Sequence, residues 1–92
     1  MIDSIAHKRL KRLFDQDDPR GLNPDHVEKI TLILTALDAA GTVEAMNLPS
    51  FRLHRLTGDL KGFWAVTVRA NWRIIFRFAD GVASDVDLID YH

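Results

Sequence analysis

Residues 63–91 read FWAVTVRANWRIIFRFADGVASDVDLIDY, and this stretch decides the fold. Aromatic and β-branched side chains dominate it, which is typical of strands. Two short turns, Ala70-Asn71 and Asp80-Gly81, divide it into three parts, and both have compositions that favour tight hairpins. The stretch just before it also alternates apolar and polar residues. We therefore predict an antiparallel meander of four strands, over about residues 51–56, 63–68, 72–78 and 82–91.

The first half of the chain predicts helices instead. Apolar side chains recur at helical spacing over residues 7–15, and Ser4 is placed to cap this helix. A second helix should begin at Asn23-Pro24, because asparagine caps helices well and proline fits the first helical position. Its apolar pattern continues as far as Gly41, which we expect to end the helix in a left-handed conformation. Residues 2–5 alternate and predict a short strand before the first helix.

The order of these elements predicts the fold class. A strand, two helices and a meander indicate an α+β fold, in which two N-terminal helices pack on one face of a mostly antiparallel sheet. A chain of 92 residues is long enough for one core, so residues 1–92 should form a single domain. On the strand over 72–78, alternation directs one set of side chains to the helices, namely Trp72, Ile74, Phe76 and Phe78. The opposite set should face solvent or a ligand, and it consists of Arg73, Ile75 and Arg77.

The charge of the chain is segmented. Hydrophobic residues make up 47% and charged residues 27%, and the formal net charge of −1 is ordinary for a folded domain. Charge counted by segment gives +3 over residues 1–12, −5 over 13–51, +5 over 52–77 and −4 over 78–92. The nearly neutral total therefore does not argue against a polyanionic partner, because the positive charge is concentrated in two segments.

Composition excludes several classes of function. The chain has no cysteine, which excludes disulfides, zinc ribbons and thiol catalysis. No apolar run reaches the roughly 20 residues of a membrane span, and the first residues lack the apolar core of a signal peptide. We therefore expect a cytoplasmic protein with no membrane partner. Glycine-rich phosphate loops, zinc-binding helix motifs and serine elbows are also missing from the sequence.

The cations of the second basic segment favour an RNA-binding surface. Arg73 and Arg77 lie four residues apart on one predicted strand, roughly 13 Å, which spans about two nucleotides of backbone. Arginine binds phosphate in a planar, bidentate manner, so such a row suits an RNA path. Exposed arginines are also common on half-buried sheets, and a solvated face is the competing interpretation. Further candidate phosphate contacts in the adjoining strands and turns are Arg55, Lys61 and Arg69.

The residue types His54, Asp90, Tyr91 and His92 suit metal-free RNA cleavage. That reaction needs a base for the 2′-hydroxyl proton, an acid for the leaving 5′-oxygen, and a cation for the charge on phosphate. Imidazole serves either as acid or as base. A metal site built from His54, Asp90 and His92 is the competing interpretation, but flanking arginines disfavour it, so we predict no metal and no cofactor. We expect His7 and His26 to lie on helix surfaces.

Over essentially its whole length the chain resembles the HigB toxins of the RelE/ParE superfamily, which belong to bacterial type II toxin–antitoxin systems. The residues that carry the resemblance are Leu53-His54-Arg55-Leu56, Gly58-Asp59, Gly62-Phe63-Trp64, the run from Val66 to Ile74, and Asp90-Tyr91-His92. It implies a RelE-like microbial RNase fold, with helices on a curved antiparallel sheet. It also implies a ribosome-dependent endoribonuclease that cleaves mRNA in the ribosomal A site without metal, by attack of the 2′-oxygen to leave a 2′,3′-cyclic phosphate, and so inhibits translation.

The resemblance also implies roles for individual residues. Its catalytic positions fall on His54, Arg73, Asp90, Tyr91 and His92, with Arg73 as a phosphate ligand. Asn71 matches a position that reads a codon base, and its amide can pair with an adenine edge, which gives a preference for A-containing codons. Relatives often carry a basic residue where this chain has Thr57, and Lys61 or Arg55 could supply that charge. The first helix would contact ribosomal RNA through Lys8, Arg9, Lys11 and Arg12.

The implied partners are the ribosome, mRNA and a helix-turn-helix antitoxin of the HigA type. Such an antitoxin also represses its operon, so the toxin would meet operator DNA only indirectly, through the antitoxin. Two alternatives remain: a ParE-like toxin that inhibits DNA gyrase, and a non-catalytic RNA- or protein-binding module. Either would keep the arginines without needing His54 or His92.

Overall fold

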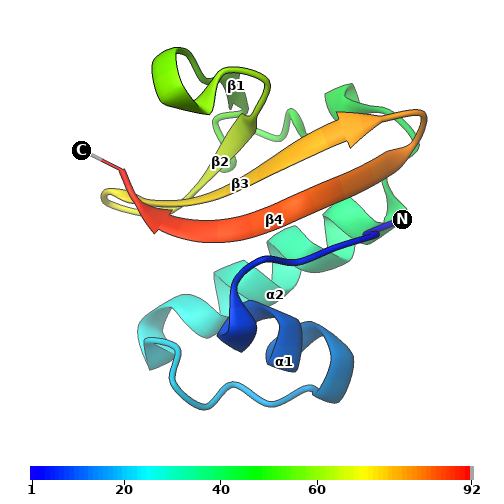
Figure 1. Cartoon of the computed structure of the whole chain (residues 1–92). Coiled ribbons are helices and arrows are strands. Elements are labelled where there is room, and N and C mark those ends of the chain that lie inside the picture. The colour runs from blue at the N-terminus through cyan, green and yellow to red at the C-terminus, as the bar shows by residue number, and fades with distance from the viewer. Residues whose placement is uncertain (92) are drawn as a thin grey trace.

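The computed structural model describes residues 1–91 and places two α-helices on one side of a twisted four-stranded sheet (Figure 1). The helices are α1 (Lys8–Gln16) and α2 (Pro24–Ala39), and two short 3₁₀ helices are η1 (Val43–Met46) and η2 (Gly58–Leu60). The strands are β1 (His54–Arg55), β2 (Trp64–Arg69), β3 (Trp72–Ala79) and β4 (Val82–Asp90). All neighbours pair antiparallel in the order β1-β2-β3-β4, so the predicted α+β class and meander are confirmed.

The N-terminal segment lies along the free edge of β4. Ile2 and Ile5 form isolated parallel bridges with Ala83 and Val86, which agrees with the predicted extended conformation. The hydroxyl of Ser4 accepts a hydrogen bond from the Asp85 amide at 2.9 Å, so the prediction that Ser4 caps α1 is wrong.

The cap of α1 is His7. Its Nδ1 accepts hydrogen bonds from the amides of Arg9 and Leu10 at 3.2 and 3.3 Å. The pairing with β4 keeps the chain extended through Ser4, and the helix therefore starts later than a local signal would place it. His7, expected on the helix surface, instead holds the first turn together.

The second helix starts as predicted and ends differently. Asn23 Oδ1 accepts a hydrogen bond from the Asp25 amide at 2.9 Å, and Pro24 occupies the first helical position. The helix ends at Ala39, and the next residue, Ala40, is extended. Gly41 does not adopt the left-handed conformation expected of it, whereas Asp17 does so at the end of α1.

Both predicted hairpins are present. Asp80 and Gly81 have φ of 53° and 77°, and positive φ at both central residues is what a type I′ turn requires. The first meander strand, however, is much shorter than the predicted 51–56. Phe51 is fully buried and Arg52 has a φ of 52°, so the backbone turns there and only His54 and Arg55 pair with β2.

The main core fills the space between the sheet and the helices. Its fully buried side chains come from both halves of the chain and include Leu10, Ile30, Leu37, Phe51, Ile74, Phe76 and Val86. A second, smaller cluster lies on the other face of the sheet and consists of Leu56, Ala65 and Ile75. Ile75 was expected to face solvent or a ligand, but it is only 3% exposed because residues of the β1–η2 region cover it.

Candidate functional site

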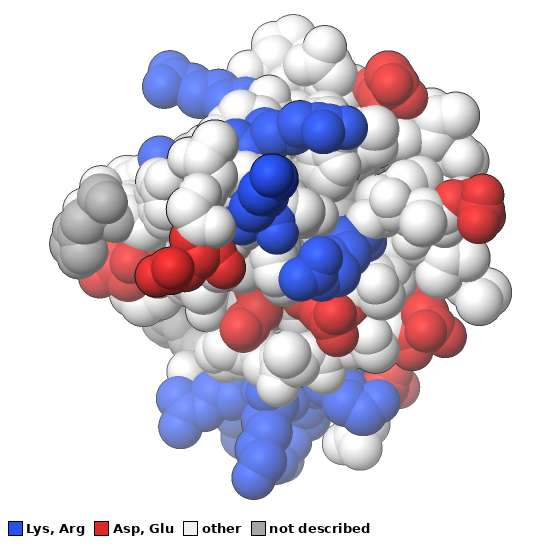
Figure 2. Space-filling view, turned by 45° about the horizontal axis from the view of Figure 1, so that its top comes forward, with Lys and Arg blue, Asp and Glu red and all other residues white. Residues whose placement is uncertain are grey.

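Two groups of basic side chains lie on different parts of the molecule. Figure 2 shows one group over the outer face of the sheet, opposite the helices, and a second group below it, with acidic side chains between them. The segment pattern of the sequence accounts for this division, because the cations of 52–77 belong to the sheet region and those of 1–12 belong to α1. The two groups must therefore be considered as separate surfaces.

Arg73 has a restrained side chain on the outer face of the sheet. Its Nη1 donates hydrogen bonds to the backbone carbonyls of Ala70 and Trp72, and these bonds hold the guanidinium against the β2–β3 hairpin. Its Nε is buried and has no hydrogen-bond partner among the described residues. A buried N–H without a partner is costly, so the hairpin holds this side chain in place against an energetic penalty.

Three further predicted residues lie at the same end of the sheet as Arg73, although the register places Asp90 on the face of Trp72 and not on the face of Arg73. Asn71 lies in the turn itself, and its carbonyl accepts a hydrogen bond from the Tyr91 amide at 2.7 Å. Asp90, the last residue of β4, is paired with Trp72 in the register of the sheet. Asn71, Asp90 and Tyr91 are all exposed. His92, the remaining predicted residue of this group, lies outside the described residues.

His54 is exposed on β1, two strands away from Arg73. It pairs with Ala65, which pairs with Ile75, so His54 shares the outer face with the β3 arginines. The strand spacings place its Cα about 12 Å from that of Arg73. His54 Nδ1 donates a hydrogen bond to the Arg52 carbonyl at 2.9 Å, because a carbonyl oxygen can only accept. The neutral ring therefore keeps its lone pair on Nε2, the form that a general base needs.

The other predicted phosphate contacts divide between two places. Arg69 is exposed at the end of β2, close to the hairpin. Arg55, Thr57 and Lys61 instead line a hollow of about 660 Å³ where β1 meets the start of β2. Arg77 does not line this hollow but lies next to two residues that do, since its guanidinium carbon is 4.4 Å from the centre of the Phe63 ring and its Nη1 approaches Gly62. These cations are not part of the group around Asn71.

The four predicted ribosome contacts lie on α1, on the helix side of the molecule (Figure 1). Lys11 pairs with Asp15 at 2.7 Å, one helical turn away. Arg9 Nη1 donates to the Gly21 carbonyl at 2.8 Å. Lys8 and Arg12 are exposed on the same helix. Two of the four cations are thus partly engaged within the molecule.

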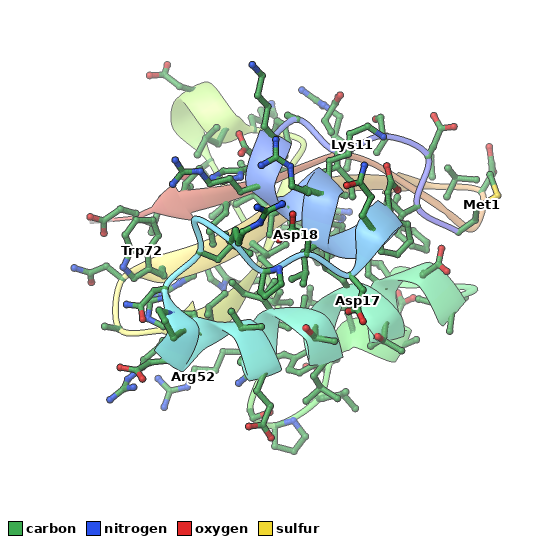
Figure 3. The ribbon with its side chains drawn as sticks, turned by 90° about the horizontal axis from the view of Figure 1, so that it is seen from below. Met1, Lys11, Asp17, Asp18, Arg52 and Trp72 are labelled. Carbon is green, nitrogen blue, oxygen red and sulfur yellow. The ribbon has the colours of Figure 1, made fainter. Side chains whose placement is uncertain are left out.

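The pairing of Trp72 with His26 was not predicted from the sequence. His26, expected at a helix surface, is 8% exposed, and its ring centre lies 6.1 Å from that of Trp72. Figure 3, seen from the helix side, shows Trp72 at the end of the sheet near the start of α2. The predicted direction of the Trp72 side chain toward the helices is confirmed. This direction, together with the predicted helix start at Asn23-Pro24, is the sequence signal from which the contact with His26 could have been predicted.

Neither a metal site nor a membrane span can be identified in residues 1–91. Within this region, no cluster of three or more histidine or acidic side chains is arranged so that it could hold a metal ion. The helices of the same region are too short or too polar to cross a bilayer.

Comparison with known proteins gives consistent matches over the whole chain. A family model described as RelE-like toxin of type II toxin–antitoxin system HigB matches residues 3–92. The chain is 42% identical over 92 residues to Endoribonuclease HigB of Proteus vulgaris, with all of both chains covered. It is 33% identical over 85 residues, 90% of each chain, to Toxin HigB-1 of Vibrio cholerae serotype O1.

Solved structures share the fold at low sequence identity. The YoeB dimer from Staphylococcus aureus matches with a TM-score of 0.56 and 16% identity, over 99% of this chain and 94% of that one. YafQ from E. coli strain BL21(DE3) matches with a TM-score of 0.54 and 17% identity, over 95% of this chain and 87% of that one. The predicted RelE-like arrangement of two helices and an antiparallel sheet is therefore confirmed.

Proposed function

Because the chain belongs to the family of HigB toxins, RelE-like toxins of type II toxin–antitoxin systems, we propose that it is an endoribonuclease that cleaves mRNA in the ribosomal A site. The observation that carries the proposal is the Arg73 guanidinium that the carbonyls of the hairpin restrain on the outer face of the sheet. It lies at the same end of the sheet as Asp90 and Tyr91, near the β2–β3 hairpin. This end of the sheet therefore carries both a phosphate ligand and groups that can exchange protons.

The proposed reaction is attack by the ribose 2′-oxygen on the adjacent phosphorus. His54 Nε2 takes the proton of the 2′-hydroxyl, since Nδ1 is occupied by the Arg52 carbonyl. The new 2′-O–P bond forms as the P–5′-O bond breaks, which leaves a 2′,3′-cyclic phosphate and a 5′-hydroxyl. Tyr91 or His92 protonates the leaving 5′-oxygen, and Arg73 neutralises the charge that develops on the phosphate oxygens. No step in this scheme uses a metal ion or a cofactor.

Asn71 is proposed to read a codon base. Its side chain is exposed in the hairpin that also restrains Arg73, so a base next to the cleaved phosphate lies within reach. An asparagine amide can donate to and accept from the edge of adenine at the same time. Such a contact favours A-containing codons, and Asn71→Ala should relax the preference.

The proposed partners follow from the two basic surfaces and the acidic segment. The α1 group of Lys8, Arg9, Lys11 and Arg12 would contact ribosomal RNA in the cytoplasm. The acidic segment 13–51 is a candidate surface for a helix-turn-helix antitoxin of the HigA type. Contact with operator DNA would then occur only through that antitoxin.

The proposal is tested with purified ribosomes carrying a message with an AAA codon in the A site. Wild-type protein should cut within that codon and leave cyclic phosphate ends. Cleavage should continue when EDTA is added at concentrations that leave the ribosomes intact. His54→Ala and His92→Ala should lower the rate at least 100-fold by removing a proton-transfer group, while ribosome binding is kept. Arg73→Lys should also be slow, because lysine cannot reproduce the planar guanidinium contacts.

The controls separate this function from its alternatives. Thermal unfolding of each variant shows whether its fold is intact, and the same message without ribosomes should remain uncut. Robust metal-dependent cleavage of that free message would contradict the proposal. Wild-type protein that binds RNA without cutting any codon would favour a non-catalytic binding module instead.

A further inference from the structure

The hollow where β1 meets the start of β2 has two arginines at or near its border, and the guanidinium of each lies over an aromatic ring. Arg55 lies over Trp64 with its guanidinium carbon 4.6 Å from the ring centre, and Arg77 lies over Phe63 at 4.4 Å. Phe63, Trp64 and Phe78 line the hollow, together with Thr57 and Lys61. The site therefore combines apolar, aromatic walls with three cations at its border.

The stacked geometry leaves the arginines able to bind an anion. A guanidinium carries five N–H donors, and contact with an aromatic ring does not use them all. Gly62 makes room for this arrangement at Arg77: a Cβ at residue 62 would lie only 2.7 Å from Arg77 Nη1. A ligand that matches both features has a flat ring and a phosphate, which is the chemistry of a nucleotide in a single strand.

We propose that this hollow binds one nucleotide of the RNA, with its base against the aromatic walls and its phosphate at Arg77. The proposal rests on the function proposed above and extends it along the strand. Arg73 and Arg77 are four residues apart on β3, about 13 Å, or about two nucleotides of backbone. The hollow thus holds a nucleotide about two positions from the phosphate bound at Arg73.

Asp85 limits the strength of this site. Its carboxylate lies 3.5 Å from Arg77 Nε, and both side chains are about half exposed. A phosphate must compete with this carboxylate for the guanidinium. The backbone of Asp85 has a φ of 51°, a conformation that asparagine also tolerates. The variant Asp85→Asn should therefore release Arg77 without changing the backbone conformation at residue 85.

The test measures binding of uncleavable 2′-O-methyl oligonucleotides of two and six residues by titration of tryptophan fluorescence. Wild-type protein should bind the hexanucleotide more tightly than the dinucleotide, because only the longer strand reaches the hollow. Arg77→Gln should weaken binding of the hexanucleotide about tenfold and leave binding of the dinucleotide unchanged. Asp85→Asn should strengthen the hexanucleotide about threefold. Arg20→Gln is the matched control, because Arg20 is also an exposed arginine paired with an aspartate, in the loop between α1 and α2.

Three outcomes would overturn this proposal. One is that Arg77→Gln and Arg20→Gln weaken hexanucleotide binding equally. Another is that Arg77→Gln weakens dinucleotide binding as much as it weakens hexanucleotide binding. The third is that an acidic peptide binds in the hollow and the hexanucleotide does not. This result would make the hollow a protein-docking site. If wild-type protein still cuts mRNA on ribosomes in any of these cases, the proposed endoribonuclease function stands and only the nucleotide site is rejected.

Discussion

At the scale of single residues, backbone conformation sets the chemistry of the candidate base. Arg52 has a positive φ, and its carbonyl accepts the hydrogen bond from His54 Nδ1. This bond fixes the tautomer of His54 and leaves Nε2 as the proton acceptor. The sequence indicates that a histidine stands at residue 54, but the bend at residue 52 arises because Phe51 is buried in the core. The tautomer is therefore a consequence of tertiary packing.

Asp18 and Arg20 give a residue-scale prediction about pH. A side-chain hydrogen bond from Arg20 is the main reason that the pKa of Asp18 falls from its ordinary 3.8 to about 2. Because the folded-state pKa is the lower one, the pair stabilises the fold above about pH 4, and this contribution is lost as the pH falls toward 2. In Arg20→Gln the pKa of Asp18 should return toward 3.8, which NMR titration of the side-chain carboxyl carbon measures. A pKa that stays near 2 would show that Arg20 is not the cause.

At the scale of elements, local signals predict the structure where neighbours in sequence supply the contacts. Asn23-Pro24 and Asp80-Gly81 both form the predicted cap and turn, because a capping amide and a pair of positive φ angles need only adjacent residues. The prediction fails at Ser4 and over residues 51–56. Ser4 bonds to Asp85, 81 residues away, and Phe51 is drawn into the core. Contacts so distant in sequence leave no local pattern.

The cap of α1 yields a prediction at this scale. His7→Ala removes the acceptor for two amides of the first turn and should lower the free energy of unfolding by about 1 kcal/mol. His7→Asn should retain most of the stability, because asparagine is a strong capping residue. Urea denaturation followed by circular dichroism measures both changes. The control is Lys8→Ala, an exposed change on the same turn; if it destabilised the protein as much as His7→Ala, the loss could not be assigned to the cap.

At the scale of the whole molecule, sheet register assembles the candidate site. The predicted hairpin already implies that Asn71, Arg73 and Asp90 lie at the same end of the sheet, because β3 and β4 run antiparallel to that end. The distance of His54 from this group, by contrast, depends on how little of residues 51–56 pairs with β2. The separation of Arg55, Lys61 and Arg77 from Asn71 likewise appears only in three dimensions.

The two basic surfaces should bind different parts of an RNA partner, and this can be measured through salt dependence. The double variant Lys8→Gln, Arg12→Gln removes two charges from α1, which lies on the helix side of the sheet (Figure 1). If each charge neutralises one phosphate, the slope of log binding constant against log salt for ribosomes should decrease in magnitude by about 2. Hexanucleotide binding should remain unchanged, since the site proposed for the hexanucleotide lies on the outer sheet face and includes neither Lys8 nor Arg12. Ribosome sedimentation at three salt concentrations measures the slope, and a variant slope equal to that of wild type would remove α1 from the ribosome interface.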